Sequence, residues 1–132
     1  MANKLLTRSQ FKDEVFRRDN HKCLVCKAPA VDAHHIIERK LFKDGGYYIE
    51  NGVSVCEVHH LMAEQTLISC EELRKLAKIK NVILPAGFEM SSNYDKWGNQ
   101  IVSSDKRLPG PLFFEDSVQK VLSSVDLLKL FD

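Results

Sequence analysis

One stretch of the chain, from Cys23 to His60, contains three of the four cysteines and four of the five histidines in the 132 residues. Cysteine and histidine side chains are the usual protein ligands of zinc. A structural zinc site has four protein ligands, whereas a catalytic metal keeps one position open for water or substrate. Because this stretch has more ligands than one closed site needs, it favours a metal-dependent enzyme over a protein that uses zinc only for stability.

Two pairs of residues within the stretch have the spacing of a tetrahedral zinc site. They are a CxxC pair, Cys23 and Cys26, and a CxxH pair, Cys56 and His59. The spacing predicts one structural zinc ion with a Cys3His ligand set. Cys70 lies far from both pairs, and we expect it to be a free thiol near the start of a helix.

The alternative is that these cysteines are ordinary buried residues or form disulfides. The first residues of the chain lack the apolar core of a secretory signal. The sequence has no run of about 18 apolar residues, so it predicts no membrane span. We therefore expect a cytoplasmic protein that does not enter a membrane. A reducing compartment of that kind favours zinc over disulfides.

Four segments taken together resemble the HNH nuclease family. They are Cys23-x2-Cys26, Ala33-His34-His35-Ile36, Glu50-Asn51-Gly52-Val53 and Val55-Cys56-x2-His59-His60. More closely, they resemble the zinc-stapled subgroup with the pattern CxxC, [DH]H, N and CxxCH. The resemblance covers about residues 8 to 68, and only the combined motif is specific. The fourth zinc ligand of that subgroup is usually a cysteine, so His59 and His60 are both candidates for its place.

The resemblance implies an α+β fold with a ββα-metal core, also called a His-Me finger, flanked by helices. Such a core is a short hairpin and a helix around one divalent ion. Here the strands would be residues 31–37 and 53–58, and the helix would be residues 59–67. Residues 1–80 would form the nuclease core, with the motif at 23–64. Residues 81–132 would be an extension packed on the same domain, and nothing in them indicates chemistry.

The resemblance also implies a role for each residue of the motif. His35 would be the general base, and Asn51 would orient that base or fix its loop. His34 and His60 would bind a catalytic divalent cation, Mg²⁺ or Mn²⁺ or another transition metal. An imidazole near its unperturbed pKa can take a proton from water at neutral pH. A divalent ion stabilises the leaving oxygen, so water could attack a DNA phosphodiester bond.

Two further points about this ligand set follow from periodicity. Glu64 lies four residues after His60 and would share its helix face, so it is a candidate oxygen ligand of the cation. The alternative for Glu64 is a solvated surface carboxylate. Adjacent residues of a strand point to opposite faces. The alternative for His34 and His35 is therefore that one is catalytic while its neighbour packs or faces solvent.

Positive charge is concentrated in the first part of the chain. The formal net charge is only +1, but residues 1–50 carry ten Lys and Arg against seven Asp and Glu. Basic side chains that flank the motif can hold nucleic-acid phosphates without reading sequence. Of these residues, we expect Arg17, Arg18, Arg39 and Lys40 to contact DNA. The alternative is a solvated charged surface.

Local signals predict three further helices. Thr7-x-x-Gln10 fits a capping box that opens a helix over residues 8–19, and Ser69-x-x-Glu72 fits one that opens a helix up to residue 80. A last helix over residues 115–130 has an apolar stripe that would dock on the core or support a dimer. Between them, residues 94–99 have turn chemistry, which suggests a small hairpin.

Three functions remain from this sequence. The first is a metal-dependent HNH endonuclease acting on DNA, of the small kind common in phages and mobile elements. The second is a zinc-stapled nucleic-acid-binding module without catalysis, and the third is a zinc-stabilised protein-interaction domain. The presence of His35, Asn51 and His60 at the three HNH positions favours the enzyme, because a binding module does not need them.

Overall fold

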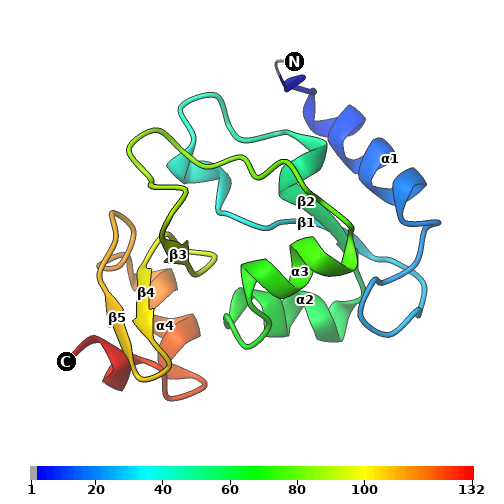
Figure 1. Ribbon diagram of the computed structural model, residues 1–132. Coiled ribbons are helices and arrows are strands. Elements are labelled where there is room, and N and C mark those ends of the chain that lie inside the picture. Colours follow the sequence, from blue (N-terminus) through cyan, green and yellow to red (C-terminus); the bar gives the residue numbers. More distant parts are fainter. Residues whose placement is uncertain (1–2) are drawn as a thin grey trace.

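Two small antiparallel sheets and four α-helices make up the computed structural model, which describes residues 3–132 (Figure 1). In chain order the elements are α1 (Arg8–Arg18), β1 (Asp32–His35), β2 (Gly52–Val55), α2 (Glu57–Glu64), α3 (Cys70–Leu76), β3 (Asn93–Tyr94), β4 (Gln100–Ser103), β5 (Lys106–Leu108) and α4 (Asp116–Ser123). Short 3-10 helices lie at Arg39–Leu41, Ile49–Asn51 and Leu128–Phe131. The predicted α+β class is confirmed.

The β1–β2 hairpin lies between two helices (Figure 1). Its register pairs Asp32 with Val55 at one end and His35 with Gly52 at the other. Because side chains alternate along a strand, the hairpin presents two different faces. Phe11 of α1 stacks on His35, whereas α2 packs against the face that carries His34. His34 therefore faces α2, whereas His35 faces α1.

Gly52 allows α1 to approach the hairpin closely. Its backbone is extended, with φ −133° and ψ 149°, so the residue is not needed for a turn. A Cβ at this position would lie 2.6 Å from the ring of Phe11 and 2.7 Å from the side chain of Val15. Any other residue would force the helix away from the strand.

The predicted bounds of the hairpin and its helix are wrong by a few residues. The second strand ends at Val55 rather than at residue 58, because Cys56 is the N-cap of α2 and the helix begins at Glu57. The first strand is limited to Asp32–His35, after which the chain turns into the 3-10 helix that starts at Arg39.

The helix starts were predicted better than the helix ends. The capping box is confirmed, since the Gln10 side chain accepts from the Thr7 N–H at 2.9 Å and the Gln10 N–H donates to the Thr7 hydroxyl at 3.2 Å. The helix predicted to reach residue 80 ends at Leu76, and Lys78 has a left-handed φ of 58°. The helix predicted over residues 115–130 ends at Ser123, and a left-handed φ of 59° at Asp126 separates it from the last 3-10 helix.

Residues 81–132 pack against the first part of the chain. The N–H of Glu38 donates to the carbonyl of Lys96 at 2.9 Å, and the indole N–H of Trp97 donates to the carbonyl of Glu64 at 2.8 Å. The apolar stripe of α4 is covered within the chain, because Val118 and Leu122 are buried. Among residues 3–132, no helix has both the length and the apolar character needed to cross a bilayer.

Candidate metal centre

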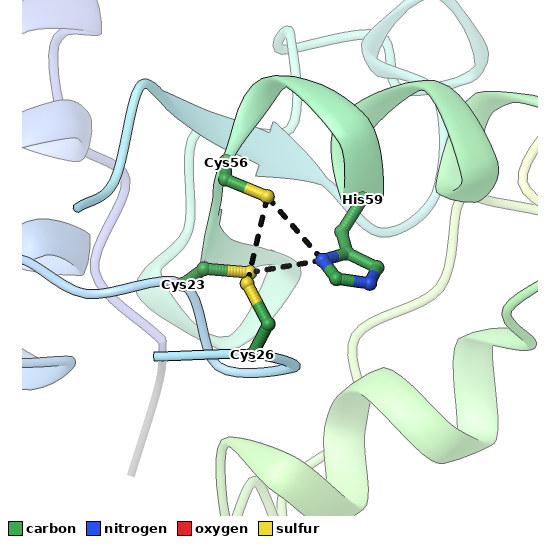
Figure 2. A group of neighbouring side chains, drawn as sticks. All are labelled: Cys23, Cys26, Cys56 and His59. Carbon is green, nitrogen blue, oxygen red and sulfur yellow. Dashed lines mark hydrogen bonds between the residues drawn. The ribbon is translucent and has the colours of Figure 1, made fainter. Parts of the chain in front are cut away.

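Two pairs of side chains that are 30 or more positions apart in sequence meet at the start of α2 (Figure 2). The ligand atoms of Cys23, Cys26, Cys56 and His59 all lie within 4.8 Å of one another. The Cys26 and Cys56 sulfurs are 3.7 Å apart, and the Cys56 sulfur is 3.3 Å from Nδ1 of His59. Two sulfurs on a tetrahedral zinc ion, with bonds of about 2.3 Å, are about 3.8 Å apart. The group fits a metal ion such as zinc.

Local structure brings each pair of the group together. Cys56 is the N-cap of α2, and His59 follows one helical turn later. Cys23 and Cys26 lie on a tight turn in which the Lys27 N–H donates to the Cys23 carbonyl at 2.9 Å. All four cysteines of the chain are free thiols, so the disulfide alternative is wrong.

The electrostatics of Cys23 suit a thiolate ligand. Burial opposes ionisation of this thiol, but backbone hydrogen bonds from Cys56, Cys26 and Val25 outweigh it and lower the pKa to about 6. Metals bind the thiolate rather than the thiol. Cys23 is therefore prepared for a metal at neutral pH.

A second group lies on the face of the hairpin that α2 covers. It consists of His34 from β1 with His60 and Glu64 from α2, and its ligand atoms also lie within 4.8 Å of one another. Nε2 of His60 is 3.1 Å from Oε1 of Glu64, and the rings of His34 and His60 have centroids 5.2 Å apart. The structure therefore brings together the three residues that the sequence indicated as cation ligands.

His34 is the least satisfied member of this second group. Its side chain is 2% exposed, and neither ring nitrogen has a hydrogen-bond partner among the described residues. Burial, followed by the positive charge of Lys96, lowers the pKa of His34 well below its usual value. A neutral imidazole with free nitrogens is the form that ligates metals.

Glu64 is the carboxylate of the group. Burial opposes its ionisation, but the hydrogen bond with His60 and the charge of Lys96 outweigh this and lower the pKa of Glu64. The side chain is 28% exposed. Glu64 contacts His60 within α2, whereas the alternative was a surface carboxylate surrounded by solvent.

His35 lies on the other face of the hairpin. Its ring stacks on Phe11 with centroids 4.5 Å apart and meets Tyr47 edge-on at 5.1 Å. Burial, and next the charge of Lys96, lower the pKa of His35 to about 4. The ring borders a cavity of about 690 Å³ that α1, β1 and Arg39 also line. His34 and His35 therefore lie on opposite faces of the hairpin, as strand periodicity predicts.

Asp32 links the cavity to the second group. Asp32 is one of the residues that border the cavity, and its Oδ2 lies 3.2 Å from Nδ1 of His60. Asp32 lies outside the four segments of the sequence motif. It stands two residues before His34, so strand periodicity places both on one face, and that signal could have identified it.

Asn51 is buried and bonded to the main chain. Its side-chain carbonyl accepts from the Ile37 N–H at 3.0 Å, and its amide donates to the Ile37 carbonyl at 3.0 Å. The main-chain carbonyl of Asn51 also accepts from Ile36 at 2.8 Å. Asn51 thus holds the backbone of Ile36 and Ile37, the segment that follows His35.

The four basic residues expected to contact DNA have different environments. Arg17 is exposed, and Lys40 forms an exposed ion pair with Glu115 at 3.3 Å. Arg39 lines the cavity beside His35 and donates to the Tyr47 hydroxyl at 3.1 Å. For Arg18 the expectation needs correction. Its guanidinium pairs with Asp19 and donates to two backbone carbonyls, of Ile49 at 2.9 Å and Gly52 at 2.7 Å.

Lys96 is a buried charged residue outside the sequence motif. Its side chain is 5% exposed, and its ammonium lies 3.3 Å from Glu38, 3.9 Å from Glu64 and 4.6 Å from the Trp97 ring centroid. The turn chemistry around it predicted a bend but gave no sign of burial. Residues 81–132 therefore place a positive charge beside Glu64 of the second group.

Cys70, by contrast, is confirmed as a free thiol at the start of a helix. It is the first residue of α3 and is buried, and burial raises its pKa to about 12.

No protein-family model, curated protein or solved structure matches this chain.

Proposed function

We propose that this chain is a metal-dependent endonuclease of the HNH type, which hydrolyses DNA phosphodiester bonds. In this proposal β1, β2 and α2 are the ββα-metal core, and the Cys3His group holds a structural zinc ion. One observation carries the proposal. A second ligand group, His34 from β1 with His60 and Glu64 from α2, shares the helix α2 with Cys56 and His59 of the Cys3His group. A module that used zinc only to stabilise its fold would have no need for it.

The properties of His34 support a cation at this second group. An imidazole that is 2% exposed and has two unpaired nitrogens costs stability unless something binds it. Two imidazoles and a carboxylate suit Mn²⁺ or a related divalent ion, and fewer than six protein ligands leave positions for substrate. When bound, the cation would supply charge stabilisation for the leaving oxygen.

The chain's own residues would divide the remaining work. His35 is neutral at physiological pH, because burial lowers its pKa to about 4. The proposal assigns it the proton of the attacking water, although this pKa makes His35 a weaker base than an imidazole that titrates near neutral pH. Asn51 would hold the backbone just after His35 in place. Arg39 lines the same cavity and would contact a phosphate, and the exposed Arg17 and Lys40 would add weaker contacts. Arg18 is occupied within the fold.

A second candidate is a zinc-stapled nucleic-acid-binding module without catalysis. The observation that favours it is the packing of His35, whose ring is stacked on Phe11 and faces away from His34. A histidine held in this way could serve the core alone. The two candidates differ in whether removing His35 abolishes a reaction or only changes stability.

The experiment compares wild type, His35→Ala and His21→Ala on supercoiled plasmid with Mg²⁺, Mn²⁺ or chelator, while bound zinc is quantified. His21 is an exposed histidine outside both ligand groups, so its variant is the matched control. We expect metal-dependent nicking or cutting by wild type and His21→Ala, and its loss in His35→Ala at unchanged zinc content. Absence of cleavage by zinc-loaded wild type under all conditions would support the binding module instead.

A further inference from the structure

The ring of His60 lies between two carboxylates. Its Nδ1 is 3.2 Å from Oδ2 of Asp32, and its Nε2 is 3.1 Å from Oε1 of Glu64. Glu64 belongs to the second ligand group together with His34, whereas Asp32 does not. The two nitrogens of His60 therefore face different carboxylates, Nε2 that of Glu64 in the ligand group and Nδ1 that of Asp32 outside it.

A histidine that ligates a metal through one ring nitrogen keeps its proton on the other. A carboxylate that accepts this proton fixes the orientation of the ring and makes the metal-bound nitrogen a stronger donor of electrons. In this chain Asp32 stands where such an acceptor would be, on the Nδ1 side of His60.

The sheet register determines this position. Asp32 is the first residue of β1 and pairs with Val55, the last residue of β2. Because α2 begins two residues later, at Glu57, its first turn lies next to Asp32 and carries His60 there. His34 shares a strand face with Asp32, so one face of β1 supplies both a ligand and the acceptor.

We infer that Asp32 is a positioning residue for the divalent cation. It accepts a hydrogen bond from Nδ1–H of His60 and thereby holds Nε2 toward the position shared with His34 and Glu64. The inference rests on the proposed function only in requiring a cation at that group. It does not require that the chain cuts DNA.

The test measures Mn²⁺ binding by calorimetry to the zinc-loaded full chain, with Asp32→Ala, Asp32→Asn and Asp13→Asn as variants. Asp13 is an exposed residue of α1 that borders the cavity next to His35. Its variant controls for the loss of one negative charge. Asparagine at position 32 can still accept from Nδ1–H, while alanine cannot. We expect Asp32→Ala to lose about 10- to 100-fold in Mn²⁺ affinity, Asp32→Asn to lose less, and Asp13→Asn to match wild type.

A second readout follows the ring itself. With Mg²⁺ bound, ¹⁵N NMR of the histidine side chains should place the His60 proton on Nδ1 in wild type and should show a mobile or altered ring in Asp32→Ala. Zinc content and the melting temperature without Mn²⁺ should be unchanged in Asp32→Ala, because Asp32 is half exposed and outside the zinc group.

The possible results separate this inference from the proposed function. Equal Mn²⁺ affinity in wild type and Asp32→Ala would overturn the inference and leave the nuclease proposal standing. Equal losses in Asp32→Ala and Asp32→Asn would show a charge effect and would also overturn it. If wild type binds no second cation, both the cation site and the inference fall.

Discussion

The ammonium of Lys96 lies 3.3 Å from the carboxylate of Glu38, although the two residues are 58 positions apart in the sequence. Their side chains are 5% and 14% exposed, so the pair is largely buried. The adjacent Trp97 is bonded to the carbonyl of Glu64 at 2.8 Å. One turn of the C-terminal segment thus contacts both the chain just after β1 and the last residue of α2. The elements β1 and α2 carry the second ligand group.

Loss of this buried pair should cost stability. We expect Lys96→Met to lower the free energy of unfolding by about 3 kcal/mol, because it leaves the Glu38 carboxylate buried without its partner. Lys40→Met is the control, since the pair of Lys40 with Glu115 is exposed and should change stability by less than about 1 kcal/mol. Urea unfolding measures both. Adding Glu38→Gln to Lys96→Met should recover part of the loss, and a further loss there would contradict the pairing.

Arg17 and Arg18 should behave differently although they are neighbours. Arg18→Lys should lower the free energy of unfolding by about 2 kcal/mol, because an ammonium cannot replace a guanidinium that pairs with Asp19 and two backbone carbonyls. Arg17→Lys should stay within about 0.5 kcal/mol of wild type. Thermal unfolding decides, and similar losses in the two variants would contradict a structural role specific to Arg18.

The cysteines should differ in reactivity toward alkylating reagents. If the Cys3His group holds zinc, we expect no fast-reacting thiol in the zinc-loaded protein, because three thiols would be metal ligands and Cys70 is buried with its pKa raised to about 12. After zinc is removed by a chelator, the exposed Cys26 should react early and Cys70 last, no faster than the protein unfolds. Mass spectrometry of quenched samples gives the order. Fast alkylation of Cys26 while zinc is bound would contradict its place in the site.

Replacing His34 with an apolar residue should not destabilise the cation-free protein. Both of its ring nitrogens are buried and unpaired among the described residues, so His34→Leu removes an unfavourable burial. Added Mn²⁺ should raise the melting temperature of wild type, because it binds the folded state, and should leave that of His34→Leu unchanged. His21→Leu, at an exposed histidine, should respond to Mn²⁺ like wild type. A large loss of stability in cation-free His34→Leu would mean that its nitrogens have partners.

Features that depend on short stretches of chain could be predicted from the sequence. The capping box of Thr7 and Gln10 forms as expected, because both partners belong to one helical turn. The four residues of the Cys3His group were predicted from spacing alone, since each pair lies within one tight turn or one turn of helix. The ends of elements were less predictable. Cys56 was predicted inside the second strand, but it is the N-cap of α2. Propensity alone does not show at which residue the backbone changes from strand to helix.

The sequence by itself determined the types of the candidate ligands and their pairing by spacing, and its resemblance to a known family implied the α+β class. The tertiary structure alone decided which charges surround them. It placed Lys96 against Glu38 and Glu64, turned Arg18 inward, and set Asp32 beside His60. The physical reason is that a local pattern fixes the direction of a side chain only relative to its own helix or strand. Its partner depends on the packing of elements far apart in the chain.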